Sequence, residues 1–428
     1  MVALQQQSQI LPAAFPKPYA KPSIPSSVGA PRAPQNDGLF APLTIKNLTL
    51  KNRIMVSPMC QYSAYDGVPN AWHFSHLTQY AIRGSGLIMA EATAVSHEGR
   101  ITPRCTGIYT DEQENVWKGI VDGVHTLGEG KIGIQIAHAG RKASTYEIFD
   151  PVRNGTSTAP RSYGGWADSP NEVLAPTAEK FQDDYPLPKE ARKEDIKRLV
   201  QAFADAAQRA DRAGFDVVEL HMAHGYLIHE FYSPLSNKRT DDYGGSFENR
   251  VRFAVEIARA VRAVWPQNKP LFARISCTDW VEGGWDLDQS IALARLLHAE
   301  GVDVVDCSSG GASPRQEIPN AFNSFQVPFA ERIRKEVPGL LTMAVGQITD
   351  AKEADGIIRN GQADLVALAR VLLANPNWPL DAAKELQVDV IWSPQYLYGA
   401  GSKSKRRQIA EEKARQVELK HGAVTASS

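Results

Sequence analysis

Two histidines and a tyrosine stand close together in the chain, as His221, His224 and Tyr226. Three interpretations fit this spacing. The two imidazoles could ligate zinc, although the carboxylate or cysteine ligands that would complete such a site are not evident nearby. They could instead be core histidines whose ring nitrogens are satisfied by neighbours. As a third possibility, both imidazoles could donate hydrogen bonds to one substrate oxygen that gains negative charge, with the tyrosine as the proton donor.

Two arginines lie inside apolar segments that we expect to be buried. Arg274 belongs to the segment LFARIS, and Arg370 ends the segment ADLVALAR. A buried guanidinium needs an anion, because an unpaired buried charge is strongly destabilising. The anion could be a protein carboxylate such as Glu91 or Asp306. It could also be an anionic cofactor, because two arginines would reach the same site without a comparable excess of carboxylates.

The residues around Arg370 favour a phosphate as that anion. Val345, Gly346 and Ala369 would supply backbone amides next to the guanidinium. Barrel enzymes commonly hold phosphate groups in this way after their seventh and eighth strands. The chain has no G-x-x-x-x-G-K-[ST] loop and no G-x-G-x-x-G after a strand, so neither of these nucleotide-binding motifs explains the site.

These side chains need a scaffold that brings the ends of several strands together. Short apolar runs alternate with longer segments of helical period, such as residues 189–213 and 248–264. The eight runs are residues 53–59, 87–95, 131–137, 215–222, 271–276, 302–308, 340–346 and 363–370. This pattern favours an α/β fold, a closed (β/α)8 TIM barrel, over an open doubly wound sheet. Catalytic residues of such barrels lie at the carboxyl ends of the strands.

Two further segments complete the predicted barrel. Residues 39–50 alternate around Asn47 and are expected to form a β-hairpin that closes the N-terminal end of the barrel. The stretch 144–188 is rich in Gly, Pro, Asp and Trp and is too irregular for a helix. We expect it to cross the opposite rim.

The composition limits the class of protein. The chain has 428 residues, 43% of them hydrophobic, with 47 Lys plus Arg against 48 Asp plus Glu. This balance excludes global disorder and leaves no basic excess for binding nucleic acid. The four cysteines have no C-x-x-C spacing, and no apolar run is long enough to span a membrane. We therefore expect a soluble cytoplasmic protein that binds neither nucleic acid nor membrane.

The two ends of the chain differ from its central region. Residues 1–37 are rich in proline, lack apolar periodicity and are predicted to be a flexible tail, with an organelle transit segment as the alternative. Residues 401–428 begin with a basic run and are predicted to be a charged extension, helical or frayed. Residues 38–400 would then form a single barrel domain.

Several motifs together resemble the Old Yellow Enzyme family. The similarity covers residues 38–400 and is greatest to the thermophilic-like branch, whose first-strand motif contains a cysteine. The block from residue 219 to 250 is highly specific, whereas EATAV alone would be weak. The motifs are SPMCQYS at 57–63, EATAV at 91–95, QIAHAGRK at 135–142, ELHMAHGYLIHEFYSP at 219–234, LSNKRTDDYGGSFENR at 235–250, DCSSGG at 306–311, VGQIT at 345–349 and the segment 363–370.

The resemblance implies a TIM barrel that holds FMN non-covalently and reduces activated alkenes with electrons from NADPH in a ping-pong cycle. Arg274 would lie beside N1 and O2 of the flavin ring. The other residues that would hold the cofactor are Ser57, Pro58 and Met59 through backbone groups, Ala92 and Gln135 at the ring edge, and Gly346, Ala369 and Arg370 at the phosphate.

The resemblance also assigns the substrate side of the site. His221 and His224 would bind the carbonyl oxygen of an α,β-unsaturated substrate, and Tyr226 would donate the proton. Tyr62 would contact the substrate. Cys60 would lie near the flavin and tune its potential, with a small buried hydrophobe as the alternative role.

One motif departs from the family pattern. Members of this branch send an arginine from a neighbouring subunit into the pocket within a Q-Y-x-R-G motif. In residues 395–399 this chain reads QYLYG, so that Tyr398 stands where the arginine would be. Tyr398 would then contact the substrate, in a homodimer or larger homo-oligomer.

Two hypotheses from other classes are kept beside the ene-reductase. His221 and His224 could be the metal ligands of a barrel hydrolase or lyase. The chain could also be a non-catalytic flavin-binding protein whose terminal segments bind a partner.

Overall fold

The computed structural model describes residues 27–150, 155–167, 172–318, 324–401, 403–411 and 413–414. Its centre is a closed barrel in which every neighbouring pair of strands is parallel. The strands in order around the barrel are β3 (Ile54–Val56), β4 (Leu87–Ala94), β5 (Ile132–Ala137), β8 (Val217–Met222), β9 (Leu271–Ser276), β10 (Val304–Ser308), β11 (Leu341–Val345) and β12 (Leu365–Leu368). Each lies within one of the eight predicted runs, so the TIM barrel is confirmed.

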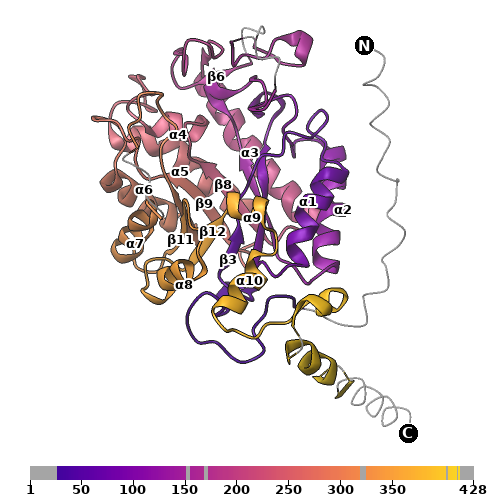
Figure 1. Cartoon of the computed structure of the whole chain (residues 1–428). Helices are drawn as coiled ribbons and strands as arrows, with labels where there is room; N and C mark the ends of the chain where they lie inside the picture. Colours follow the sequence, from indigo (N-terminus) through magenta and orange to yellow (C-terminus); the bar gives the residue numbers. More distant parts are fainter. Residues whose placement is uncertain are drawn as a thin grey trace.

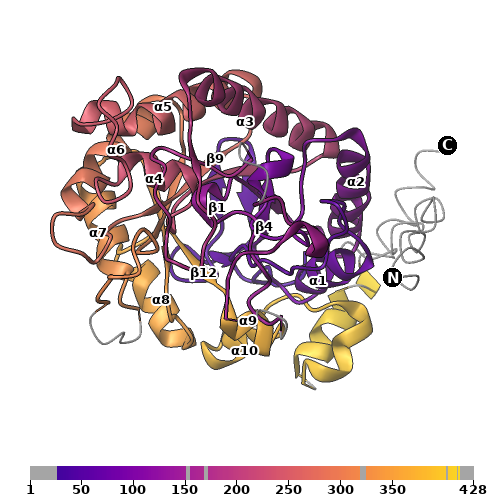
Figure 2. The same cartoon turned by 90° about the horizontal axis from the view of Figure 1, so that it is seen from above.

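Helices surround the barrel and cover the outer faces of its strands (Figure 2). The outer helices are α1 (Ala71–Ala81), α2 (Asp111–Thr126), α3 (Lys193–Ala213), α5 (Phe247–Val264), α6 (Leu287–Ala299), α7 (Val327–Glu336) and α8 (Ala351–Arg359). The strands are buried on both faces, which is why they read as nearly continuous apolar runs. In α3 the buried residues recur at helical spacing, as Ile196, Leu199 and Phe203, and Gly214 ends the helix with a φ of 93°.

A β-hairpin closes the N-terminal end of the barrel, as predicted. It pairs β1 (Leu43–Ile45) with β2 (Leu48–Leu50) in antiparallel register. Ile45, Leu48 and Leu50 are buried in one cluster with the side chains at the start of the strands, among them Val217 and Phe272. The hairpin therefore removes the lower barrel interior from water.

Side chains that point to the barrel axis change in character along each strand, because alternate residues share one face. At the N-terminal end of β8, β9 and β10 they are apolar, then they are charged, and at the C-terminal end they are polar. In these three strands the successive inward residues are Val217, Phe272 and Val304, then Glu219, Arg274 and Asp306, then His221, Ser276 and Ser308. The polar inward-facing side chains of these strands are thus gathered at the C-terminal rim of the barrel.

The irregular stretch after β5 lies at this rim, as expected. Its described residues form the 3-10 turn η4 (Arg161–Tyr163) and the short pair β6 (Leu174–Ala175) and β7 (Lys189–Glu190). Figure 1 shows β6 at the far end of the barrel from α8 and α10 (Trp378–Glu385). The segment contacts α4 (Leu227–Tyr232), the short helix that follows the histidine pair.

The prediction that residues 1–37 form a flexible tail is wrong for the last part of this segment, which packs against the chain. Val28 is fully buried, Gly29 N donates to Ile391 O at 2.8 Å, and Pro31 forms an antiparallel bridge with Val390. The backbone of this segment pairs with residues 389–391, and this pairing could not be predicted from the sequence of the segment alone. Residues 1–26 lie outside the described part of the chain.

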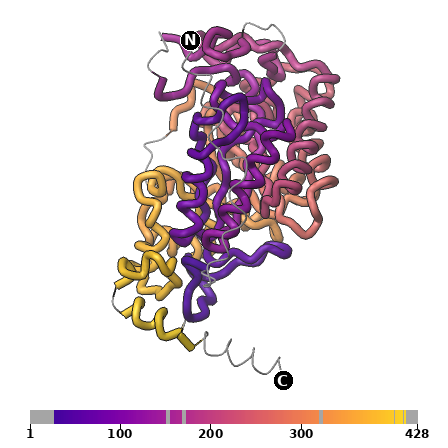
Figure 3. The backbone as a smooth tube through the Cα atoms, turned by 90° about the vertical axis from the view of Figure 1, so that its right-hand side faces the viewer, coloured from indigo at the N-terminus to yellow at the C-terminus, as the bar shows by residue number. Residues whose placement is uncertain are grey.

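The predicted C-terminal extension is helical over residues 403–411. In Figure 3 the indigo beginning and the yellow end of the described chain lie together at one end of the molecule. Arg32 forms ion pairs with Asp389 and Glu411, and Gln408 is buried between them and Trp392. Among the residues described, no helix is both long enough and apolar enough to cross a bilayer.

Candidate active site

The β8 strand delivers the histidine pair to the rim. His221 lies in β8 and is paired in register with Arg274 of β9, while His224 follows the strand in a left-handed conformation with a φ of 62°. The His221 ring lies 5.1 Å, centroid to centroid, from the rings of both His224 and Tyr226. The three residues predicted to act together are therefore in contact.

Hydrogen bonds fix His224, whereas one ring nitrogen of His221 has no partner among the described residues. His224 Nε2 lies 2.7 Å from Ser308 Oγ, and His224 N donates to Ser276 Oγ at 2.9 Å. His221 Nδ1 is buried and has no hydrogen-bond partner within the described part of the chain. In the tautomer that carries its proton on Nδ1, this nitrogen is suited to donate to a bound ligand.

Both imidazoles are neutral near pH 7. Burial lowers the pKa of each histidine well below its ordinary value, and the charge of Arg274 lowers it further. The Tyr226 hydroxyl, in contrast, has its pKa raised well above the ordinary value, first by burial. The pair can therefore donate neutral hydrogen bonds while the tyrosine keeps its proton.

A charged layer lies directly below the histidines. Arg274 Nε lies 3.2 Å from Asp306 Oδ2, and Arg274 Nη1 donates to Ser57 Oγ at 3.1 Å. The protein carboxylate named as one possible partner of Arg274 is thus present, whereas Glu91 pairs with His73 at 3.2 Å instead. Arg274 does not depend on a cofactor alone for its counter-charge.

The same layer contains a second buried carboxyl group. Gln135 Nε2 donates to Glu219 Oε1 at 2.7 Å, and Glu219 Oε2 has no hydrogen-bond partner within the described residues. Burial, with the neighbouring Asp306, raises the pKa of Glu219 to about 8. Glu219 is therefore protonated near neutral pH, and Asp306 supplies the negative charge beside Arg274.

The first strand ends in the predicted SPMCQYS segment. Ser57 is buried, Pro58, Met59 and Cys60 are partly exposed, and Gln61 N donates to Glu91 Oε2 at 3.1 Å. Although the residue is partly exposed, a hydrogen bond with Cys105 and then desolvation of the sulfur raise the pKa of Cys60 well above its ordinary value, so Cys60 is a thiol. The Tyr62 ring packs edge-on against Phe149, with 5.8 Å between centroids.

Ala92 lies on the same side of the barrel as Tyr226. It lines a small cavity together with Ala137, Arg100 and Tyr226. Ala92 also stands in register with Gln135 after an irregularity in the β4–β5 pairing. This register brings the two predicted ring-edge contacts, Ala92 and Gln135, next to each other.

A cavity of about 680 Å³ opens at the carboxyl ends of β11 and β12. The predicted phosphate residues Gly346, Ala369 and Arg370 line it together with Arg274. Gly346 has a φ of 113°, and a Cβ there would lie 2.4 Å from Gln326 Nε2. Only glycine fits this close turn without displacing the neighbouring amide.

The predicted burial of Arg370 is wrong. The strand β12 ends at Leu368, and Arg370 is an exposed first residue of α9 (Arg370–Ala374). The chain leaves the barrel wall at Ala369, so the guanidinium faces the cavity mouth rather than the interior. It forms no ion pair within the described residues and is free for an external anion.

Sequence reasoning missed two residues that shape the site. Gln326 donates to Val345 O at 2.9 Å and accepts from Ser309 Oγ at 2.5 Å, which fixes the wall beside Gly346. Lys142 Nζ donates to His224 O at 2.8 Å and to Gly311 O at 2.6 Å, holding the strained His224 backbone. Lys142 is part of the QIAHAGRK motif, which was the available signal, whereas Gln326 lies in no motif.

Tyr398 is not brought to the site within one chain. It lies in η5 (Pro394–Gly399), 88% exposed, with Lys405 Nζ 3.4 Å from its ring centroid. Its contact with a substrate in a neighbouring subunit stays a prediction.

For the metal hypothesis, the residues that the structure describes contain no group of three or more His, Cys, Asp or Glu able to hold an ion.

Comparison with known proteins identifies the family. The model of the NADH:flavin oxidoreductase / NADH oxidase family matches residues 38–389. The chain belongs to this family. The NADPH dehydrogenase of Geobacillus sp. (strain WCH70) is 45% identical over 363 residues, which cover 84% of this chain and 98% of that protein. An NADH:flavin oxidoreductase of Gibberella zeae is 41% identical over 386 residues, covering 87% of this chain and 91% of that protein.

Solved structures agree with this assignment. Morphinone reductase is 30% identical, with a TM-score of 0.66 over 84% of this chain and 93% of that chain. The Old Yellow Enzyme homologue from Zymomonas mobilis is 27% identical, with a TM-score of 0.67 over 84% of this chain and 98% of that chain. The resemblance to the Old Yellow Enzyme family is therefore confirmed, and the protein is a flavin oxidoreductase.

The described residues fit an FMN molecule in this family member. The cavity with Arg370 and Gly346 suits a phosphate, because a guanidinium that forms no ion pair with the described residues stands beside a glycine turn. Towards the barrel axis, His221 Nδ1 and Glu219 Oε2 are buried polar atoms without partners within the described chain. Arg274 borders the cavity and also faces Ser57, and so connects the two regions.

Proposed function

We propose that this flavin oxidoreductase is an FMN-dependent ene-reductase that uses NADPH to reduce the activated C=C bond of α,β-unsaturated carbonyl compounds. Nitroalkenes and maleimides belong to the same substrate class, because each has an oxygen that gains negative charge. The observation that carries this proposal is the neutral pair His221 and His224 in contact with Tyr226, next to the arginine-lined cavity. The name NADPH dehydrogenase carried by relatives supports the reductant.

FMN, when bound, would carry a hydride from the nicotinamide to the β-carbon of the alkene. Ser57, Gln135 and Arg274 would hold its ring, and Gly346, Ala369 and Arg370 its phosphate. Arg274 borders the cavity, and its guanidinium would favour an anionic reduced cofactor. Cys60 remains protonated and would contact the ring as a polarisable thiol.

The histidine pair would stabilise the negative charge that develops on the substrate oxygen. A neutral imidazole donates a hydrogen bond without losing its proton, and the buried site keeps competing water away. Tyr226 would give its proton to the α-carbon, because its raised pKa keeps the hydroxyl protonated until a strongly basic carbon is presented. The nicotinamide would occupy the same pocket first, in a ping-pong cycle.

The colour of the purified protein tests the proposal. The holoenzyme is expected to be yellow, to lose its colour when mixed anaerobically with NADPH, and to regain it when cyclohexenone is added. Colour that persists after NADPH would contradict the proposal. Bleaching without recovery on addition of any activated alkene would leave a flavin reductase and exclude the ene-reductase.

A further inference from the structure

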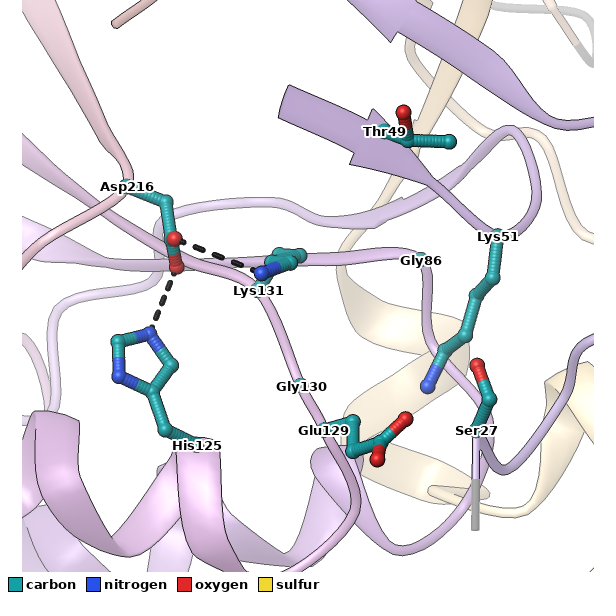
Figure 4. A pocket seen from close by; sticks show the side chains of 9 residues that line it. All are labelled: Ser27, Thr49, Lys51, Gly86, His125, Glu129, Gly130, Lys131 and Asp216. Atoms are coloured by element: carbon teal, nitrogen blue, oxygen red, sulfur yellow. Dashed lines mark hydrogen bonds and ion pairs between the residues drawn. The ribbon is translucent and has the colours of Figure 1, made fainter. Parts of the chain in front are cut away.

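A second cavity, of about 410 Å³, lies at the N-terminal end of the barrel, opposite the site described above (Figure 4). Its walls come from segments that immediately precede barrel strands: Gly86 precedes β4, Lys131 precedes β5 and Asp216 precedes β8. The remaining lining residues are Ser27, Thr49, Lys51, His125, Glu129 and Gly130. None of these residues belongs to the proposed FMN or substrate site.

Lys51 has an ammonium group in this cavity that none of the described residues satisfies. Its Nζ is buried and has no hydrogen-bond partner within the described chain. Figure 4 shows the group between Glu129 and Ser27, pointing into the cavity. Burial lowers the pKa of Lys51 to about 8, Lys131 adds to the effect and Glu129 opposes it. A buried amine without an acceptor is costly, so a ligand that supplies an acceptor gains binding energy.

The carboxylates of the cavity do not fill this role. Asp216 Oδ2 is hydrogen-bonded to His125 Nε2 at 2.8 Å and accepts from Ile132 N at 3.0 Å. Asp216 Oδ1 lies 3.8 Å from Lys131 Nζ. Glu129 is exposed and makes no ion pair with Lys51 among the residues described. The cavity therefore presents two ammonium groups and the hydroxyls of Ser27 and Thr49 against two carboxylates. Asp216 is already hydrogen-bonded, and Glu129 leaves Lys51 Nζ without a hydrogen bond among the described residues.

We propose that this cavity binds a small oxyanion, a phosphate or carboxylate group, with Lys51 as its principal ligand and Lys131 as the second cation. Lysine ammonium groups bind such anions as compact point charges, and the hydroxyls can donate to the remaining oxygens. The volume admits a small molecule that carries the group. Because the cavity lies at the opposite end of the barrel, the anion and FMN can be bound together.

Competitive acetylation tests the site in the FMN-loaded enzyme. Lys51 is treated with acetic anhydride in the presence of inorganic phosphate, acetate or chloride at equal ionic strength, and its modification is read by mass spectrometry. A bound oxyanion is expected to lower Lys51 acetylation about tenfold at ten times its Kd. Protection by phosphate alone identifies a phosphate site, and protection by acetate as well identifies a general oxyanion site. Equal protection by chloride would show mere screening and overturn the proposal.

Lys46 provides the matched control, because it lies in the turn of the hairpin that precedes Lys51 but is satisfied by the protein. Its Nζ donates to Gln267 O at 3.0 Å and lies 3.5 Å from Asp303 Oδ1. Acetylation of Lys46 is expected not to respond to phosphate. A response equal to that of Lys51 would contradict a specific site.

The variants Lys51→Met and Lys46→Met give a second readout, thermal unfolding of the FMN-loaded enzyme. Phosphate at ten times its Kd is expected to raise the Tm of the wild type and of Lys46→Met by about 2 °C. Lys51→Met is expected to show no such rise, and to unfold above the wild type in phosphate-free buffer because an unpaired buried charge has been removed. An equal phosphate-dependent shift in Lys51→Met would overturn the proposal.

Discussion

His221 is held by its strand with one buried ring nitrogen left without a partner among the described residues. Replacing it with alanine is expected to slow alkene reduction about 100-fold, because one donor to the developing oxyanion is lost. Binding of phenols, whose oxygen would accept from the same donors as the substrate oxygen, should weaken, while the FMN content of the purified protein stays the same. The measurements are steady-state turnover and a spectroscopic phenol titration.

His298→Ala serves as the control for this variant. His298 lies on the outer helix α6, and its Nδ1 is 3.1 Å from Val302 O, away from the barrel rim. The substitution is expected to leave both turnover and phenol binding unchanged. Undiminished phenol affinity in His221→Ala would remove His221 from the substrate site.

Replacement of Gly346 should weaken the binding of FMN. In Gly346→Ala the new Cβ would meet the Gln326 amide, which is already held by Val345 O and Ser309 Oγ, at a φ that disfavours alanine. The expected result is a loss of FMN affinity of about tenfold or more, from strain of about 1 to 3 kcal/mol. The measurement is FMN dissociation on dilution.

Gly283→Ala separates the clash from the backbone strain. Gly283 has a φ of 72°, but a Cβ added there would meet no described atom within 4 Å. This variant should retain FMN at the wild-type level. If both variants lose FMN equally, the close contact at Gly346 is not what holds the cofactor wall.

For single residues, the sequence predicted which side chains take part in the site better than it predicted the burial and contacts of each side chain. His221, His224 and Tyr226 could be grouped because their spacing on one strand end forces them together. Arg370 could not be placed correctly, because the apolar run hides the point at which the chain leaves the barrel wall. Gln326 could not be predicted as a site residue, because its role depends on a contact with Gly346 that is distant in sequence and leaves no local pattern.

At the scale of elements, a buried carboxyl group connects the helix α4 to the segment that follows β5. Glu230 Oε1 accepts from Arg141 N at 2.9 Å, and burial raises the pKa of Glu230 to about 8. A carboxyl group with a folded pKa above its unfolded value stabilises the fold least at high pH. Its contribution is intact below an unfolded pKa of about 4.3 and is lost as the pH rises towards 8.

Glu230→Gln is therefore expected to gain stability relative to the wild type as the pH rises from 5 to 8. The difference in the free energy of unfolding should grow by up to about 1.4 kcal/mol per pH unit, as measured by urea denaturation. The exposed Glu194→Gln on α3 is the control and should show no such slope. A difference that does not change with pH would contradict the protonated state of Glu230.

The barrel strands were predictable because burial on both faces leaves continuous apolar runs, and the hairpin because its alternation is strict. The short pair β6 and β7 and the helix α4 were not. The segment after β5 and the segment after His224 pack on one another. Each of these elements is too short to show a helical or strand periodicity in the sequence.

For the whole molecule, the two ends of the described chain contact each other, because the Arg32 guanidinium donates to Gln408 Oε1. Gln408 Nε2 donates to Trp392 O at 2.8 Å and Gln408 Oε1 accepts from Trp392 N at 3.1 Å. Gln408→Ala is expected to lower the free energy of unfolding by about 1 to 2 kcal/mol, because the half-buried backbone N–H and C=O of Trp392 lose their partners. Chemical denaturation measures the change.

Arg406→Ala on the same helical segment is the control, because Arg406 is exposed. It should unfold like the wild type, and both variants should keep their FMN. Loss of FMN from Gln408→Ala would mean that the terminal contact reaches the active site, contrary to its position at the other end of the barrel.

The central claim is that Arg370 and the Gly346 turn hold the phosphate of FMN, and the affinities of FMN and riboflavin test it most directly. Apoprotein of the wild type and of Arg370→Met is titrated with each flavin and followed by quenching of flavin fluorescence. Loss of a charge-assisted contact is expected to weaken FMN binding about 10- to 100-fold while riboflavin, which has no phosphate, binds both proteins equally. Equal FMN affinity in the two proteins, or an equal loss for riboflavin, would contradict the claim.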